Sequence, residues 1–165
     1  GRNSAHNNSF GFLEHDALGR CCPIAAHVRR ANPRDAKTAS DSDSLMLVRR
    51  RRILRRGRLY GPHTNELRPT VGDGKRRGLY FVALNANIGR QFEFLQQTWL
   101  NNPKFGGLTD DRDPVVAQAE HPGSASLPAL PFRRRLDGLP RFVTVRGGEY
   151  FFLPGLAALD RLLAK

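Results

Sequence analysis

Cysteine, lysine and long apolar runs are scarce in this chain of 165 residues. The two cysteines, Cys21 and Cys22, are adjacent. Neighbouring cysteines rarely pair with each other and lack the spacing of a metal-binding knuckle, so we expect two free thiols and a reducing compartment. No apolar run approaches the roughly 18 residues needed to cross a bilayer. Residues 1–9 are polar and offer no core for a signal peptide, so we expect a cytoplasmic protein without a membrane anchor.

Acidic residues are also few relative to basic ones, and the formal net charge is +12. Nearly all of the cations are arginine, which favours bidentate contacts to carboxylates and phosphates. The densest run is residues 49–52, four consecutive arginines. A basic chain suggests nucleic-acid binding, but no aromatic residues alternate with these arginines. A basic nucleic-acid-binding domain is therefore the weakest of the interpretations considered below.

Four segments carry the β-branched and aromatic residues that are typical of strands. Residues 78–86 are nearly all apolar, which predicts a strand buried on both faces. A second strand is predicted over residues 52–60, ahead of a Gly-Pro turn. Residues 142–145 and 150–153 flank a Gly-Gly pair and predict a hairpin.

Helices are predicted from apolar residues that recur every three or four positions. In residues 88–100 they fall at i, i+4, i+7 and i+11, which predicts one amphipathic helix. Residues 156–163 carry leucines on one face and predict a second helix. Residues 23–31 have no clean period and are expected to form either a short helix or an irregular segment, ended by the Asn-Pro pair that follows.

The remaining segments, rich in Gly, Pro, Ser and Asp, are predicted as loops. The longest of these segments, residues 1–22 and 103–131, are expected to be largely loop, and residues 40–44 are expected to be a solvated loop. The order of strands and helices predicts one α+β domain over residues 1–165, with an antiparallel sheet and helices on one face.

One stretch concentrates the candidate site residues. His27 lies in a short apolar run, two arginines follow it, and an Asn-Pro turn then leads to Arg34. A histidine that binds a metal and an arginine that binds an acid would suit a flat, apolar cofactor with anionic groups at its rim. The same stretch also fits a basic surface loop with an incidental histidine.

Several segments together resemble the dye-decolorising (DyP-type) haem peroxidases. Residues 22–34, Cys-Pro-x-x-Ala-His-x-Arg-x-x-Asn-Pro-Arg, resemble that family's haem-ligand segment. Residues 54–61 resemble its distal-arginine segment, residues 78–81 and 90–99 the strand and helix that follow, and residues 147–155 the closing hairpin. The resemblance implies the C-terminal, haem-binding half of such a protein: a ferredoxin-like unit that forms one half of a dimeric α+β barrel.

On the proximal side of a haem b, the resemblance implies three roles. His27 would be the axial iron ligand, and Arg34 would bind a haem propionate. The position matched to the acidic partner of the proximal histidine is Asn87. A neutral partner would orient the imidazole but push less electron density to the iron, which predicts weaker oxidising power.

On the distal side, the resemblance implies that Arg55 is the catalytic arginine, with Arg56 as the alternative. Its cation would stabilise the negative charge that develops as the peroxide O–O bond breaks. Leu79 and Phe81 would form the apolar distal wall. The family's Gly-x-x-Asp-Gly segment, whose aspartate is the distal proton shuttle, has no match in this chain, so general acid–base assistance of about 10²–10⁴ would be missing.

Two interpretations besides nucleic-acid binding stay open. The first is a haem-dependent peroxidase that uses hydrogen peroxide to oxidise organic donors such as dyes and phenolics. The second is a non-catalytic or degenerate haem-binding module, which the missing aspartate and Asn87 favour. Either interpretation implies an N-terminal half as another segment or chain, and a homo-oligomer stays open.

Overall fold

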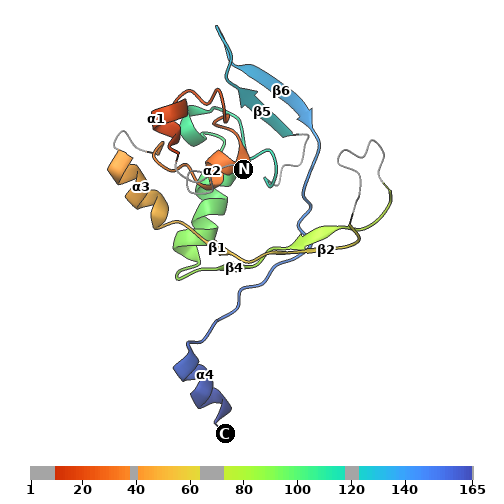
Figure 1. Ribbon diagram of the computed structural model, residues 1–165. Coiled ribbons are helices and arrows are strands. Elements are labelled where there is room, and N and C mark those ends of the chain that lie inside the picture. The colour runs from red at the N-terminus through yellow and green to blue at the C-terminus, as the bar shows by residue number, and fades with distance from the viewer. Residues whose placement is uncertain (1–9, 38–40, 64–72, 118–122, 165) are drawn as a thin grey trace, which may run out of the picture.

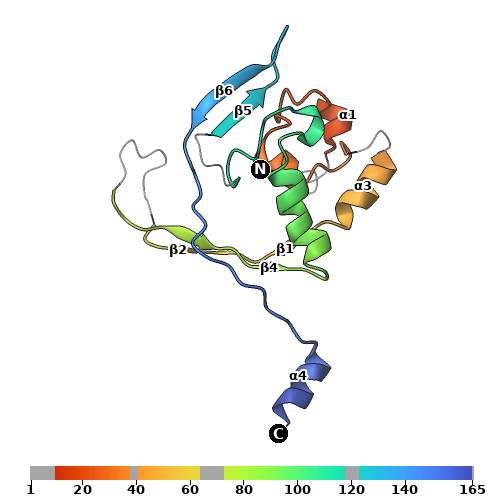
Figure 2. The same ribbon diagram turned by 180° about the vertical axis from the view of Figure 1, so that it is seen from behind.

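The computed structural model describes residues 10–37, 41–63, 73–117 and 123–164 (Figure 1). The chain is an α+β protein with three parts. A packed body contains most of the helices and one strand pair. A ribbon of short paired strands lies along one side of the body, and an arm over residues 140–164 leaves the body and ends in an isolated helix (Figures 1 and 2).

The body is built from short helical segments, several of which pack against η3. They are α1 (Phe12–Asp16), α2 (His27–Ala31), α3 (Asp41–Arg49), η2 (Gly89–Glu93), η3 (Leu95–Leu100) and η4 (Phe105–Gly107). In η2 and η3 the backbone makes wide turns with hydrogen bonds from residue i+5 to residue i, such as Glu93 N to Ile88 O at 3.1 Å. The helix expected over residues 88–100 is therefore present, although its turns are wider than those of an α-helix.

The strands form three separate antiparallel pairs. They are β1 (Leu54–Arg55) with β4 (Ala83–Leu84), β2 (Arg58–Tyr60) with β3 (Gly78–Tyr80), and β5 (Gly123–Leu127) with β6 (Arg134–Leu139). The α+β class and the antiparallel pairing are confirmed. Within the described residues the pairs do not join into one sheet or close into a barrel, because each strand has a single neighbour.

Two buried clusters make the core of the body. One contains Val48 of α3 and Leu95, Trp99 and Phe105, and the other contains Ala25, Leu108 and Ala125, with Ile24 packed against both. The apolar stripe predicted on residues 88–100 thus supplies the centre of the first cluster, where Trp99 is 1% exposed. The position of α2 follows from these clusters, since Ile24 and Ala25 lead directly into it.

Three sequence expectations were wrong. The hairpin over residues 142–153 is not formed; this segment is extended, and Phe151 and Phe152 are exposed. Residues 78–86 are interrupted between β3 and β4 and are largely exposed, not buried on both faces. In both places most of the large apolar side chains stay exposed, although the rings of Phe81 and Tyr150 both lie near that of Phe92. A strand is buried on both faces only when other segments cover both faces.

The third wrong expectation concerns loops. Residues 41–44, expected to be a loop, form the first turn of α3, where Ser and Asp side chains are favourable because they accept from free N–H groups. The end of the long predicted loop 103–131 contains β5. The helix expected over residues 156–163 is confirmed as α4 (Leu156–Leu163). No helix in the described part of the chain is long and apolar enough to cross a membrane.

Candidate functional site

The short helix α2 presents His27 at its first residue, and a buried carboxylate holds the imidazole. His27 Nδ1 lies 2.8 Å from Asp113 Oδ2. The Asp113 side chain has no exposed surface, whereas that of His27 is 35% exposed. The other carboxylate oxygen of Asp113 accepts hydrogen bonds of 2.9 Å from the backbone N–H groups of Val115 and Val116. Asp113 is therefore held on both oxygens, and it fixes the orientation of the imidazole ring.

The charge state of Asp113 follows from its partners. Burial by itself raises the pKa of a carboxyl group. At Asp113 the hydrogen bond from His27 and the two backbone N–H groups outweigh burial and lower the pKa below its ordinary value. The ionised carboxylate accepts a hydrogen bond from Nδ1–H of His27. In the neutral imidazole, the proton on Nδ1 leaves Nε2 with a lone pair. A nitrogen of this kind is a metal ligand.

Asn87 does not stand beside His27, so that part of the sequence prediction was wrong. Its side-chain oxygen accepts a hydrogen bond of 2.8 Å from Arg90 N, and its own N–H donates to the Gln91 side chain at 2.9 Å. Asn87 thus caps the start of η2. The partner of the histidine is an ionised aspartate from the segment that was predicted as a loop, 86 residues away in the sequence. Sequence spacing offered no signal for this pairing.

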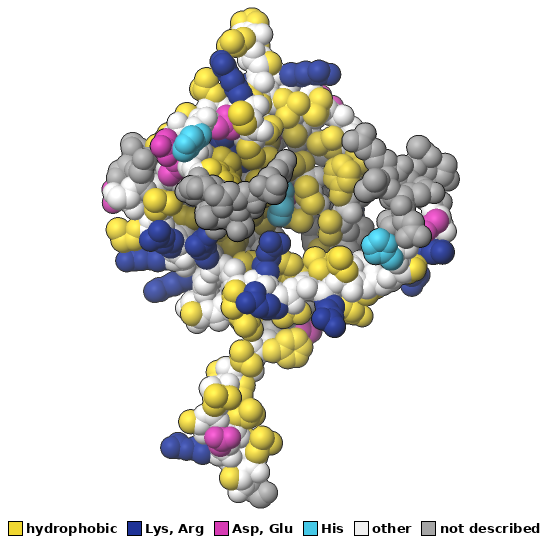
Figure 3. All heavy atoms as spheres, in the orientation of Figure 1, with side chains coloured by type: hydrophobic (Ala, Val, Ile, Leu, Met, Phe, Trp, Pro, Cys, Tyr) yellow, Lys and Arg dark blue, Asp and Glu magenta, His cyan; other side chains and the backbone are white. Residues whose placement is uncertain are grey.

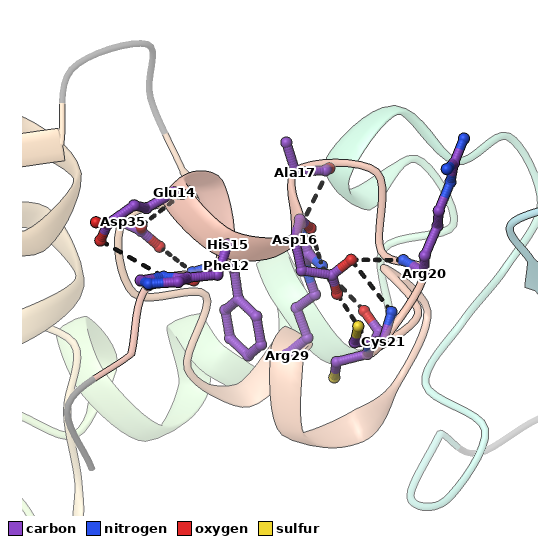
Figure 4. Close-up of polar contacts among 11 residues, drawn as sticks. Phe12, Glu14, His15, Asp16, Ala17, Arg20, Cys21, Arg29 and Asp35 are labelled. Atoms are coloured by element: carbon purple, nitrogen blue, oxygen red, sulfur yellow. Dashed lines mark hydrogen bonds and ion pairs between the residues drawn. The ribbon is translucent and has the colours of Figure 1, made fainter. Parts of the chain in front are cut away.

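Buried arginines anchor α2 to the chain on both sides of it. Arg29 enters the loop that precedes α2, where its Nη1 donates to the Asp16 carbonyl and the Cys22 carbonyl at 2.9 Å each and to the Asp16 carboxylate at 3.2 Å (Figure 4). The Asp16 carboxylate also accepts from the backbone N–H groups of Arg20, Cys21 and Cys22. Both cysteines are free, as expected.

Arg34 lies just after α2 in an unusual conformation. Its φ of 54° is in the left-handed region, where a residue with a Cβ is strained. Its guanidinium stacks on the Phe10 ring at 3.7 Å and donates to the Phe10 carbonyl at 3.1 Å. Burial lowers the pKa of Arg34, and the nearby charge of Arg52 lowers it further. The Asp35 carboxylate opposes this shift. Two cations and one carboxylate leave a net positive charge here, which favours an anionic ligand.

The other predicted residues lie on the strand ribbon. Arg55 is exposed in β1, opposite Ala83 of β4. Leu79 in β3 and Phe81 just after it are about half exposed, and the Phe81 ring lies 6.0 Å from that of Phe92. Figure 3 shows a hollow between the body and the ribbon, with apolar side chains gathered around it. The ribbon thus offers an apolar surface with an arginine beside it.

The structure therefore divides the candidate residues into two groups, His27, Asp113 and Arg34 on the body and Arg55, Leu79 and Phe81 on the ribbon. Among the described residues no group of three or more His, Cys, Asp or Glu side chains could hold a metal ion. A metal at His27 would thus have fewer than three ligands of these types from the described residues and would need to bring other ligands with it. Haem iron meets this requirement, because the porphyrin supplies four nitrogens and the protein an axial histidine. The residues present fit a haem.

Comparison with known proteins gives a consistent picture, although no family model matches the chain. The multifunctional dye peroxidase DyP2 of Amycolatopsis sp. is 37% identical over 166 residues, which cover 94% of this chain and 35% of that protein. The dye-decolorizing peroxidase msp1 of Mycetinis scorodonius is 32% identical over 96% of this chain and 33% of its own length. The structure of DyP2 superposes with a TM-score of 0.73 and 35% identity, covering 98% of this chain and 37% of that one. The chain thus spans about a third of the length of these relatives, in their C-terminal part.

Proposed function

Because this chain belongs to the family of dye-decolorizing peroxidases, we propose that it is the haem-binding part of a peroxidase that uses hydrogen peroxide to oxidise organic donors such as dyes and phenolics. The hydrogen bond between His27 and Asp113 carries this proposal. It combines a partly exposed imidazole with a buried, ionised carboxylate, and such a carboxylate would make the histidine a stronger ligand for a haem iron.

The bound haem b would supply the redox chemistry, accepting the oxidising equivalents of peroxide and passing them to the donor one electron at a time. His27 would bind the iron through Nε2. Asp113 would hold the proton on Nδ1 and increase the electron density of the ring, which favours the higher oxidation states of the iron. This is the opposite of the weak ligand that a neutral Asn87 would have produced, and it removes one of the two reasons for a degenerate module.

Two arginines would complete the contacts with haem and peroxide. Arg34 would bind a propionate, supported by its partial burial and its proximity to the charge of Arg52. Arg55 would place a cation where negative charge develops on the peroxide oxygens. Leu79 and Phe81 would exclude water from that side of the haem. Asn87 would act on the haem indirectly, through the start of η2.

The distal aspartate of the family would come from outside this chain. We propose that the preceding part of the longer protein supplies it and covers the ribbon and the arm. Two observations support this partner: the chain spans about a third of its relatives, and large apolar side chains are exposed on the arm, among them Phe152 at 87%. A second copy of the chain is the alternative occupant. A cytoplasmic location is also proposed, supported by the two free thiols.

Haem titration of the 165-residue chain tests the proposal. We expect wild type to develop a Soret band of a histidine-ligated haem and His27→Ala to lose it, whereas His15→Ala, which removes an exposed histidine, should titrate like wild type. Equal spectra for wild type and His27→Ala would reject His27 as the ligand. Peroxide-dependent dye oxidation by the haem-loaded chain, with and without the preceding part of the protein, then separates the peroxidase from the degenerate module: no turnover in either sample would favour the module.

A further inference from the structure

We infer that Arg30 is a positioning residue that holds Asp113 against His27. The inference rests on the proposed function for the role of His27 as an iron ligand, but the contacts that support it belong to the ligand-free chain. They concern one buried guanidinium, one shared carbonyl group and the geometry of α2.

Arg30 is fully buried, and its guanidinium donates to four backbone carbonyl groups. Nη1 lies 2.8 Å from Trp99 O, 2.9 Å from Leu100 O and 3.2 Å from Asn102 O. Nη2 lies 3.1 Å from Asn102 O and also donates to Asp111 O. These carbonyls come from the end of η3 and from the loop that leads to Asp113. A single side chain of α2 therefore holds both ends of this loop.

One of these carbonyl groups connects Arg30 to Asp113 directly. The oxygen of Leu100 accepts a hydrogen bond of 2.8 Å from the Asp113 backbone N–H as well as the bond from Arg30. A second accepting group, Asp111 O, lies two residues before Asp113. Carbonyl groups at a helix end have no partner within the helix, so Arg30 and the Asp113 N–H together satisfy them. The backbone of Asp113 is thereby fixed relative to α2.

The geometry of α2 brings both interactions to the same place. His27 and Arg30 are three residues apart, and side chains at this spacing share one face of a helix. His27 uses that face to donate to the Asp113 side chain, and Arg30 uses it to hold the Asp113 backbone. Arg29 is turned about 100° away from Arg30 around the helix axis and binds the loop of Asp16 instead (Figure 4).

Arg29 provides a matched control, because it is also buried, belongs to the same helix and donates to backbone carbonyl groups. The experiment compares Arg30→Lys with Arg29→Lys in the ligand-free 165-residue chain with ¹⁵N-labelled histidine. Lysine keeps the charge but loses the planar fork that reaches several acceptors at once. Nitrogen chemical shifts report which ring nitrogen of His27 carries the proton, and solvent exchange of that proton reports its hydrogen bond.

In wild type we expect Nδ1 protonated, Nε2 unprotonated and the Nδ1 proton protected from exchange. Arg30→Lys should accelerate this exchange about tenfold or more, the effect of weakening one charge-assisted hydrogen bond, and should populate the other tautomer. Arg29→Lys should leave both readouts as in wild type. Equal effects of the two substitutions, or no effect of Arg30→Lys, would overturn the inference, since a general loss of stability acts on both variants alike.

A double-mutant cycle and one wild-type measurement complete the test. If Arg30 acts through Asp113, then Arg30→Lys should change the His27 signals little further in the Asp113→Asn background; an undiminished change there contradicts it. If Arg30→Lys does not fold, hydrogen exchange of the guanidinium protons in wild type provides the test. We expect the protons of Arg30 to exchange far more slowly than those of exposed Arg58, and equal exchange rates would overturn the inference. A wild-type chain that does not bind haem would reject the proposed function without affecting these results.

Discussion

The backbone carbonyl of Arg34 accepts a hydrogen bond of 2.8 Å from the hydroxyl of Ser44, which is fully buried in α3. The same hydroxyl accepts from the Lys37 N–H at 2.8 Å. Ser44 therefore closes the turn that holds Arg34 at a positive φ. This tether joins α3 to the residue proposed to bind a propionate, and it leads to the first prediction.

Replacing Ser44 by alanine should remove the hydrogen bond to the Arg34 carbonyl and the hydrogen bond from the Lys37 N–H. We expect the free energy of unfolding to fall by about 1–3 kcal/mol, measured by urea denaturation, and the haem affinity to fall with it because Arg34 is no longer held. Thr98→Ala removes an exposed hydroxyl from η3 and should change neither quantity. Unchanged stability and unchanged haem affinity in Ser44→Ala would show that the tether is dispensable.

Asp35 should make stability depend on pH. Burial raises the pKa of its carboxyl, but N–H groups at the start of α1, including Phe12 N at 2.6 Å, outweigh this and lower the pKa below its ordinary value (Figure 4). A group with a lowered folded-state pKa stabilises the protein fully above its unfolded pKa of about 4, and the contribution is lost as the pH falls further.

Asp35→Ala should therefore be less stable than wild type by about 1–2 kcal/mol near neutral pH, and the difference should narrow below about pH 4. Denaturation curves at several pH values measure both effects. Glu149→Ala, which removes an exposed carboxylate from the arm, serves as the control. If Asp35→Ala lowered the free energy of unfolding by the same amount at neutral and acidic pH, this equal loss would contradict the role for the ionised carboxylate.

The two adjacent cysteines should differ in reactivity. Cys21 is exposed, whereas Cys22 is half-buried and burial raises the pKa of its thiol. Because the thiolate is the reactive form, we expect iodoacetamide at neutral pH to modify Cys21 several-fold faster than Cys22, as followed by peptide mass spectrometry. In Asp16→Ala, which loses the acceptor for both backbone N–H groups, the two rates should approach each other. Equal modification rates of Cys21 and Cys22 in wild type would indicate that both thiols are equally accessible to iodoacetamide, which would contradict the burial of Cys22.

Replacing an aromatic residue by alanine should reduce stability strongly in the packed body and only slightly in the exposed arm. Trp99→Ala should reduce the free energy of unfolding by about 3–5 kcal/mol, because the indole fills the first core cluster. Phe152→Ala should change the stability of the isolated chain by less than about 0.5 kcal/mol. If the proposed preceding part covers the arm, Phe152→Ala should weaken the association of that part with this chain. A large loss of stability in the isolated chain would mean that the arm packs on its own body.

Local sequence patterns predicted those elements that depend on neighbouring residues. The helix over residues 156–163 and the buried face of residues 88–100 follow from periodicity. Residues 23–31 have no clean period, and only the expected end before Asn32-Pro33 was local information, which α2 follows by ending at Ala31. The prediction of a hairpin over residues 142–153 was wrong because a hairpin also depends on residues far away in the sequence. A hairpin with an apolar face requires another surface to cover that face, and the described chain does not supply one.

The sequence by itself determined the α+β class, the free thiols and the identity of His27 as the central candidate, because composition, spacing and motif order are all local properties of the chain. Only the tertiary structure decided that Asp113, and not Asn87, is the partner of His27. Only the fold could show that Arg29 and Arg30, neighbours in the sequence, bind different segments, Arg29 the loop of Asp16 and Arg30 the end of η3. Such pairings join residues that are tens of positions apart, and the packing of α2 against η3 and the loop after it brings them within hydrogen-bonding distance.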